Sequence, residues 1–431
     1  MQKVLRYSDS NFQLCLDRVL AERNTSTGDI IEPVRRIIEG VQEKGDKALL
    51  EYTKRYDGVS FDPADLMVPV EEINYSYDKC ARRDLEALEF AAERIGLFHK
   101  HQLPESFSFT DDLGVGLGAK WTPLKAVGIY VPGGKAVYPS SLLMNAIPAK
   151  MAGVDRVAMT VPCPDGAISP YLLAAAKISG VAEIYKIGGA QAIAALAYGT
   201  ETIPRVDKIV GPGNAFVAEA KRQVFGMVGI DSIAGPSEIL VVADGETDAE
   251  WVAIDLLSQA EHDVDAKCTL ITDDTGLVEK VHKEINDILG TLERGDIASK
   301  SWERNGMIII VEQLDDAAKI INQIAPEHVE LAVSSPKKLV DSIKNAGAIF
   351  VGRHTPEAIG DYVAGPNHVL PTSGSARFTS GLSVLDFFKC TNLVECSRSG
   401  LKEIGPSGIT LAEREGLGAH ARSIAVRLSS V

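Results

Sequence analysis

The chain has 431 residues, of which 45% are apolar and 24% are charged, and its formal net charge is −15. This length predicts more than one domain, and the composition is typical of a globular enzyme. The negative charge argues against nucleic acid and anionic membranes as partners. The chain has no apolar run of membrane-spanning length, and its six scattered cysteines form no CxxC pair. We therefore expect a cytoplasmic protein with reduced thiols.

Helical periodicity dominates the first quarter of the chain. Apolar side chains recur at helical spacing in residues 12–20, 30–41 and 83–98. Glycine and proline are sparse in this region, so we expect packed helices here rather than a site.

From Val115 onward, strand and helix patterns alternate. A first run of expected strands comprises residues 115–121, 126–131, 157–162, 183–187 and 208–210. A second run comprises residues 238–243, 268–272, 307–311 and 348–351. Helical segments separate these strands, and such βα repeats predict parallel sheets covered by helices. Two successive runs predict two sheet domains, followed by a small C-terminal element that has no core of its own.

Three glycine turns follow strands of the first run. Their sequences are Pro132-Gly133-Gly134, Gly188-Gly189-Ala190-Gln191 and Gly211-Pro212-Gly213-Asn214. Glycine allows close approach of a ligand, and a following helix offers backbone N–H groups to phosphate. None of the turns has the GxGxxG pattern, and each alone is also consistent with an ordinary βα turn. Together, at the carboxyl ends of parallel strands, they indicate a phosphate or dinucleotide site.

Gln259 and His262 close a helix that Thr247 and Glu250 are expected to cap. Their spacing of three places both side chains on one helical face, where an amide oxygen and an imidazole can hold a metal ion. A solvated helix end explains the pair equally well.

Asp361 and His420 extend the Gln259/His262 pair to a candidate nitrogen and oxygen ligand set. Asp361 lies in the Gly- and Pro-rich segment 360–374, which is longer than a connector needs and also contains His368. A set of this kind does not separate zinc from manganese or cobalt.

Glu327 and His328 follow Pro326. Neighbouring side chains diverge on a helix and alternate on a strand, so a shared site requires an irregular turn, which the proline can provide. A carboxylate beside an imidazole is a reasonable general-base pair. The alternative is a surface glutamate followed by a packed histidine at the start of a strand.

Longer motifs carry a resemblance to a known family. They are GIYVPGGKAVYPSSLLMNAIPAK, KIGGAQAIAAL, VGPGNAFV, GPSEI, DLLSQAEHD, APEHVEL, GDYVAGPNHVLPTSG and EGLGAHA. Over nearly the whole chain they resemble histidinol dehydrogenases, and no matching position departs from the family's pattern. The resemblance implies oxidation of L-histidinol to L-histidine with two NAD⁺ through an aldehyde that stays bound.

The resemblance also implies roles for individual residues. One Zn²⁺ would be held by Gln259, His262, Asp361 and His420, and it would anchor the substrate rather than activate water. His328 would take the hydroxyl proton, and Glu327 would activate the water that hydrates the aldehyde. The remaining implied contacts are His368, Ser237 and Glu415 with the substrate, and Tyr130, Gln191 and Asn214 with NAD⁺.

The implied fold has two incomplete Rossmann-like parallel-sheet domains and small terminal domains, in an intertwined homodimer. We expect an N-terminal helical segment (1–24), a first α/β domain with the metal and catalytic residues (25–106 and 237–382), connecting strands (107–128), a second α/β domain with the NAD contacts (129–236) and a C-terminal tail (383–431). In the dimer, Glu415 and His420 would reach the site of the partner subunit.

Three other interpretations remain open. A family relative would oxidise a different polyol, although Glu415 and the PNHVLPTSG segment favour histidinol. A zinc hydrolase would use Glu327 to activate water on the metal, but an HExxH motif is missing and the glycine turns would have no role. A binding protein without catalysis would show no turnover.

Overall fold

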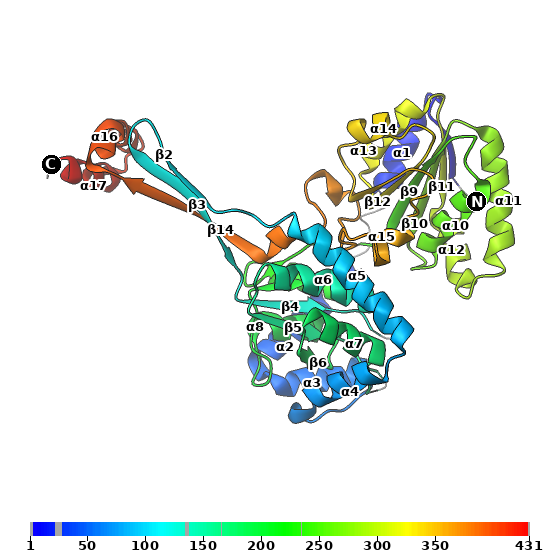
Figure 1. Ribbon diagram of the computed structural model, residues 1–431, viewed down its shortest axis with the longest axis horizontal. Helices are drawn as coiled ribbons and strands as arrows, with labels where there is room; N and C mark the ends of the chain where they lie inside the picture. Colours follow the sequence, from blue (N-terminus) through cyan, green and yellow to red (C-terminus); the bar gives the residue numbers. More distant parts are fainter. Residues whose placement is uncertain (1–2, 22–27, 134–137, 165, 234, 430–431) are drawn as a thin grey trace.

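The computed structural model describes residues 3–21, 28–133, 138–164, 166–233 and 235–429. Two lobes and a projecting arm make up the molecule (Figure 1). The first lobe is built on the sheet β6-β5-β4-β7-β8, the second lobe on the sheet β1-β11-β10-β9-β12-β13, and the arm on the sheet β14-β3-β2. Every helix among the described residues is too short or too polar to cross a membrane.

The first lobe contains a five-stranded parallel sheet. Its strands are β4 (Ala126–Tyr130), β5 (Arg156–Thr160), β6 (Glu183–Tyr185), β7 (Lys208–Val210) and β8 (Gly229–Ile230). Side chains alternate along β4, so Val127 and Ile129 enter one apolar core while Ala126 and Tyr130 enter the other. Burial on both faces is why this strand is apolar throughout.

Helices cover both faces of this sheet. One core includes side chains of α4 (Val70–Lys79), α5 (Arg82–Lys100), α6 (Pro139–Met151) and α7 (Pro170–Ser179). The opposite core includes side chains of α2 (Gly28–Lys44), α3 (Asp46–Tyr56), α8 (Gly189–Tyr198) and α9 (Ala215–Val224). Residues 28–100 therefore belong with 126–230. This differs from the expected grouping of 25–106 with 237–382, because the apolar faces of α2 to α5 pack on the first sheet and its helices.

The second lobe contains a six-stranded parallel sheet. Its strands are β1 (Lys3–Arg6), β9 (Glu238–Ala243), β10 (Lys267–Thr272), β11 (Met307–Ile310), β12 (His328–Ala332) and β13 (Ala348–Val351). One face packs against α1 (Phe12–Ala21), α13 (Ala317–Ile324) and α14 (Lys337–Ser342), and the other against α10 (Ala249–Ala260), α11 (Thr275–Leu289) and α12 (Gly295–Asn305). The short α15 (Ala358–Tyr362) follows β13.

Two expectations for this lobe need correction. The segment expected to be helical (1–24) contains a strand, β1, ahead of helix α1, because Lys3–Arg6 pairs with β11. The N-cap of α10 is Asp248 rather than Thr247, since the Asp248 carboxylate accepts the N–H of Glu250 at 2.9 Å. Thr247 instead bonds to Asp244 and to the carbonyl of Ala332.

Both parallel sheets share one strand order. Taken in chain order, the strands β4 to β8 and β9 to β13 each run 3-2-1-4-5 across the sheet. A complete doubly wound dinucleotide-binding fold has the order 3-2-1-4-5-6. Each sheet is therefore an incomplete Rossmann-like sheet, and the second has β1 added at its edge.

The arm combines segments that the sequence separates widely. In it β3 (Val115–Pro123) lies between β2 (Phe107–Thr110) and β14 (Phe388–Cys396), all antiparallel, and the chain ends in α16 (Arg398–Arg414) and α17 (Gly418–Ser429). The expected connecting strands and C-terminal tail thus form one unit. Figure 1 shows this unit extending away from both lobes, with α16 and α17 at its tip.

A buried ion pair fixes the glycine turn after β7. The ammonium of Lys221 on α9 contacts the Asp231 carboxylate, and both side chains are almost inaccessible to solvent. Lys221 Nζ also donates to the carbonyl of Gly211 at 3.0 Å, while Asp231 accepts the Gly211 N–H at 2.7 Å. Gly211 has φ +105° and lies against the backbone of Tyr130, so this position requires glycine.

Replacing Asp231 by alanine should destabilise the first lobe by about 3–5 kcal/mol, because the Lys221 ammonium would remain buried without its partner. The free energy of unfolding from urea denaturation, followed by circular dichroism, measures this loss. Asp265→Ala is the matched control. Its partner is Arg304 at an exposed site, and a loss within about 1 kcal/mol is expected there. Similar losses in both variants would contradict the role of the buried pair.

Candidate active site and cofactor cavity

Glu327 and His328 lie where the chain enters β12. Ala325 ends α13 in the left-handed conformation at φ 48°, and Pro326 follows before the strand starts at His328. Both side chains reach the peptide groups of Glu238 on the neighbouring strand β9. Glu327 Oε2 accepts the Glu238 N–H at 2.9 Å, and His328 Nδ1 donates to the Glu238 carbonyl at 3.0 Å.

This contact with Glu238 answers the two interpretations of the Glu-His pair. Glu327 and His328 are only 6% and 4% exposed, so Glu327 is not a surface residue. The expected irregular turn is present and brings Glu327 Oε2 within 3.7 Å of His328 Nδ1. Because a carbonyl can only accept, Nδ1 of His328 has the proton and Nε2 is left as an acceptor.

Burial shifts the protonation of both groups. Desolvation raises the pKa of Glu327 well above its ordinary value, with the charges of Glu238, Asp361 and Glu357 adding to the rise. Desolvation also lowers the pKa of His328 to about 4. At neutral pH His328 is a neutral imidazole, and its unprotonated Nε2 lies 3.5 Å from Glu357 Oε1. The neutral imidazole is the form that can accept a proton.

Asp361 lies on α15, close to His328. Its carboxylate, the Glu357 carboxyl and a ring nitrogen of His328 lie within 4.8 Å of one another. Burial opposes ionisation of Asp361, but the hydrogen bond and charge of His368 outweigh it and lower its pKa. Burial raises the pKa of Glu357 to about 9, and its protonated carboxyl hydrogen-bonds Asp361. An ionised Asp361 supported by a neutral Glu357 is suited to binding a cation.

His368 lies beside Asp361, and the segment between them contacts the first lobe. His368 Nδ1 donates to the Asp361 carbonyl at 3.1 Å. Arg94 of α5 donates to the carbonyls of Val363 and Ala364, at 3.3 and 3.1 Å. These contacts hold the segment between Asp361 and His368 against the first lobe.

Gln259 and His262 lie at the end of α10, in mutual contact. Gln259 Nε2 is 3.2 Å from His262 Nδ1. Gln259 is buried, and within the described part of the chain its Oε1 has no hydrogen-bond partner. His262 is exposed, and a positive charge on it would lower the pKa of both Asp361 and His328. The second lobe thus brings together Gln259, His262, Asp361, His328 and His368.

The other predicted substrate contacts lie in different places. Ser237 is half-buried directly before β9, next to Glu238, whose backbone Glu327 and His328 contact. Glu415 and His420 are exposed residues of the arm, at the end of α16 and on α17. Figure 1 shows α17 at the tip of the arm, far from α10, β12 and α15 of the same chain. One subunit therefore does not bring His420 to Gln259, His262 and Asp361.

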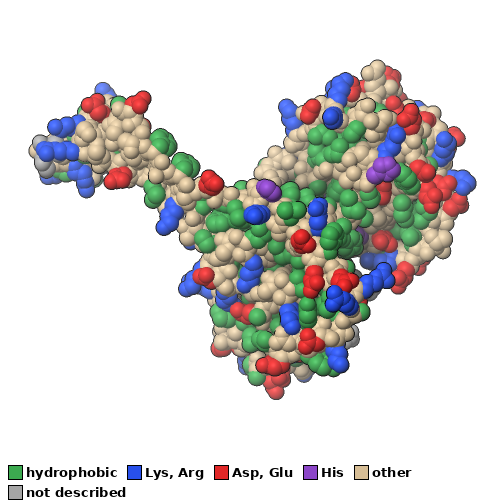
Figure 2. Space-filling model, in the orientation of Figure 1, with side chains coloured by type: hydrophobic (Ala, Val, Ile, Leu, Met, Phe, Trp, Pro, Cys, Tyr) green, Lys and Arg blue, Asp and Glu red, His purple; other side chains and the backbone are tan. Residues whose placement is uncertain are grey.

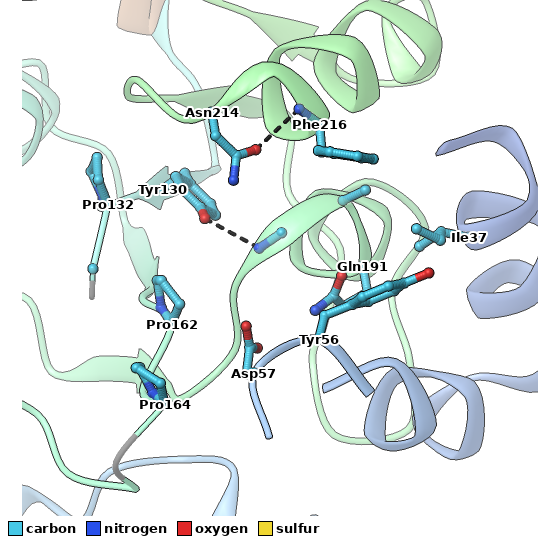
Figure 3. Close-up of a pocket in the computed structure, with 13 residues that line it drawn as sticks. Ile37, Tyr56, Asp57, Tyr130, Pro132, Pro162, Pro164, Gln191, Asn214 and Phe216 are labelled. Atoms are coloured by element: carbon cyan, nitrogen blue, oxygen red, sulfur yellow. Dashed lines mark hydrogen bonds between the residues drawn. The ribbon is translucent and has the colours of Figure 1, made fainter. Parts of the chain in front are cut away.

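Tyr130, Gln191 and Asn214 line one cavity of about 370 Å³ in the first lobe (Figure 3). The cavity lies at the carboxyl ends of β4, β5, β6 and β7, which includes the point between β4 and β7 where the strand order reverses. Ligands of open parallel sheets bind at this position. Gln191 is 1% exposed, and its Nε2 lacks a partner among the described residues.

Some of the backbone donors that the sequence suggested at the glycine turns around this cavity have partners within the protein. The Gly189 N–H donates to the hydroxyl of Tyr130 at 3.1 Å. Asn214 Oδ1 caps α9 by accepting the N–H groups of Phe216 and Val217. Gly134 of the first expected turn lies outside the described residues. These donors, which were expected to hold phosphate, are therefore taken by the protein.

Sequence reasoning missed three residues of these two sites. Glu238 acts through its backbone, which has no sequence signal. Glu357 lies four positions before Asp361, and this helical spacing could have identified it. Asp57 lines the cavity from the end of α3, in a region that we expected to contain packed helices rather than a site.

Comparisons with known proteins agree with this architecture. A sequence model of the family described as histidinol dehydrogenase matches residues 20–428. The histidinol dehydrogenase 1 of Nostoc sp. is 55% identical over 428 residues, covering 99% of both chains. The histidinol dehydrogenase of Gluconobacter oxydans is 54% identical over 426 residues, again covering 99% of both chains. The crystal structure of histidinol dehydrogenase from Elizabethkingia anophelis superposes with a TM-score of 0.94 at 35% identity, covering 100% of this chain and 98% of that one.

The chain is an NAD-dependent oxidoreductase by these matches. Its two incomplete Rossmann-like sheets, its cavity at a strand-order reversal and its buried Glu-His pair agree with this class. It belongs to the histidinol dehydrogenase family.

Proposed function

We propose that the protein oxidises L-histidinol to L-histidine with two NAD⁺ and one Zn²⁺ per subunit, through an aldehyde that stays bound. The observation that carries this proposal is the buried contact of Glu327 and His328 with the backbone N–H and carbonyl of Glu238, beside Asp361, in a chain of this family. The reaction needs two proton acceptors of different kinds, and the pair offers them.

His328 is the proposed base for the alcohol. Its Nδ1–H is donated to the Glu238 carbonyl, so Nε2 keeps its lone pair for the substrate hydroxyl. Because burial keeps the imidazole neutral, Nε2 can take the hydroxyl proton while hydride leaves the same carbon. The fixed tautomer means that the ring needs no rearrangement before the step.

Glu327 is the proposed base for water. Once the aldehyde has formed, the Glu327 carboxylate removes a proton from a water molecule, and this water adds to the carbonyl carbon. The carbonyl oxygen receives the proton that His328 took in the first step, which gives the diol. His328 then accepts a hydroxyl proton of the diol as the second hydride leaves, and the carboxylic acid forms. The raised pKa of Glu327 makes it a stronger base than an exposed glutamate.

Gln259, His262 and Asp361, with His420 of the partner subunit, are the proposed zinc ligands. The unpartnered Oε1 of Gln259 and the ionised carboxylate of Asp361 fit a cation. When bound, zinc would supply the positive charge that anchors and orients the amino and imidazole nitrogens of the substrate. The geometric triad His328, Glu357 and Asp361 shares only Asp361 with this set. We assign His328 to proton transfer and Glu357 to holding Asp361.

The cavity of the first lobe is the proposed NAD⁺ site, with Tyr130, Gln191 and Asn214 as contacts. Its place at the carboxyl ends of β4 and β7 and the unpartnered amide nitrogen of Gln191 support this assignment. NAD⁺ would accept the hydride at each of the two steps. Ser237 and His368 border the substrate from the second lobe in this proposal.

We propose a homodimer in which each arm completes the site of the partner subunit with Glu415 and His420. The arm exposes large apolar side chains, among them Val394, Leu411 and Leu417, and Figure 2 shows apolar groups along its narrow part. Exposed apolar surface on a projecting element favours burial against another chain.

Exhaustive chelation should abolish NADH formation from L-histidinol and NAD⁺, and added Zn²⁺ should restore it, because the substrate would lose its anchor. Absorbance at the NADH band measures the rate, and metal analysis before and after chelation is the control. Full activity of the metal-free protein would contradict the metal assignment. Turnover of another polyol but not of histidinol would contradict the assignment of histidinol as the substrate.

His328→Ala and His420→Ala homodimers should each be nearly inactive. Unfolding and refolding an equal mixture should recover about one quarter of wild-type activity, since half of the dimers are mixed and one of their two sites is intact. Each variant refolded alone is the control. A mixture as inactive as its components would argue against a shared site.

Glu327→Gln should slow the oxidation of supplied histidinal more than that of histidinol to the aldehyde, because only the former needs an activated water. In the wild type the aldehyde step should accelerate as the pH rises through the raised pKa of Glu327, since the ionised form is the base. The variant should lack this dependence. Single-turnover rates of both half-reactions across pH measure it, and equal losses in the two steps would count against the assigned role.

A further inference from the structure

One acidic residue lines the proposed cofactor cavity without a role so far. Asp57 follows α3, and among the described lining residues it is the only charged one. Figure 3 shows its carboxylate directed into the space between Pro162 and Gln191. The Gly188 N–H at the start of α8 donates to this carboxylate.

The second oxygen of Asp57 is the informative atom. Oδ2 is buried and has no hydrogen-bond partner among the described residues. A buried carboxylate oxygen without a donor is unfavourable, so a donor supplied by a ligand would stabilise it. A carboxylate can accept hydrogen bonds but repels phosphate, which has no donor to offer.

The surroundings of Asp57 indicate which donor fits. Tyr56 and Phe216 are 52% and 42% exposed and lie on the same side of the cavity as Gln191 (Figure 3). Exposed aromatic rings beside a cavity offer faces on which a purine can stack. A ribose attached to that purine would then present its hydroxyl groups nearby.

We propose that Asp57 accepts the 2′-hydroxyl of the adenosine ribose and thereby selects NAD⁺ over NADP⁺. This inference rests on the proposed use of the cavity for NAD⁺. In doubly wound sheets an acidic residue after the second strand receives this hydroxyl. Here the acid comes from a helix outside the sheet, packed against α8. A 2′-phosphate at the same point would face the carboxylate and be repelled.

Equilibrium titration of the cofactors tests this assignment without turnover. Fluorescence titration gives the Kd for NADH, for NADPH and for the 2′-deoxyadenosine form of NADH. The wild type should bind NADH about tenfold more tightly than either of the others, as expected for one hydrogen bond to a charged group. Asp57→Asn should reduce the NADPH-to-NADH ratio of Kd values by about tenfold. Asp57→Ala, which has no acceptor at this position, should no longer distinguish NADH from its deoxy form.

Asp62→Asn is the matched control, because Asp62 is exposed and lies outside the cavity, and it should leave all three Kd values unchanged. An unchanged selectivity in a folded Asp57→Asn protein would overturn the assignment. If that variant does not fold, equal wild-type affinity for NADH and its deoxy form would overturn it instead. A wild type that binds none of the three would overturn the proposed cofactor site itself.

Discussion

The backbone of one residue, Glu238, organises the chemistry proposed for this protein. Its N–H and carbonyl engage Glu327 and His328 at 2.9 and 3.0 Å. The two contacts are possible because β9 and β12 are neighbouring parallel strands in register, with Ile239 opposite His328. They fix the tautomer of the imidazole and hold the carboxylate beside it. Any disturbance of the β9–β12 pairing would therefore displace both groups at once.

The two sheets have the same strand order, but their candidate sites lie at opposite ends of the strands. In the first lobe the cavity lies at the carboxyl ends of the strands, where ligands of such sheets bind. In the second lobe Glu327 and His328 lie at the amino end of β12. The corresponding carboxyl edge is occupied by Asp244, which accepts hydrogen bonds from Ser334 and Arg353. Burial alone would raise the pKa of Asp244, but these hydrogen bonds lower it to about 2. Asp244 is therefore ionised at neutral pH, and it lies with its hydrogen-bond partners at the carboxyl ends of these strands.

Much of this architecture could be predicted from the sequence. The alternation of strands and helices predicted both parallel sheets, and Pro326 predicted the turn that lets Glu327 and His328 share a site. Other features depend on contacts that no local pattern encodes. Three examples join segments far apart in the chain. They are the packing of α2 to α5 on the first sheet, the pairing of β1 with β11, and the hydrogen bonds of Glu327 and His328 with the Glu238 backbone. The glycine turns were expected to offer donors, but tertiary contacts such as that of Tyr130 with Gly189 occupy some of them.

The pairing of β1 with β11 affects how the chain can be built during synthesis. Lys3 pairs with Met307, about three hundred positions later, and the intervening chain includes the whole first lobe. As the protein leaves the ribosome, its first strand must wait until that lobe and most of the second sheet have been translated. The first lobe can close around its own core in the meantime. β1 then joins a sheet that already contains β9, β10 and β11, although its residues precede those strands in the chain.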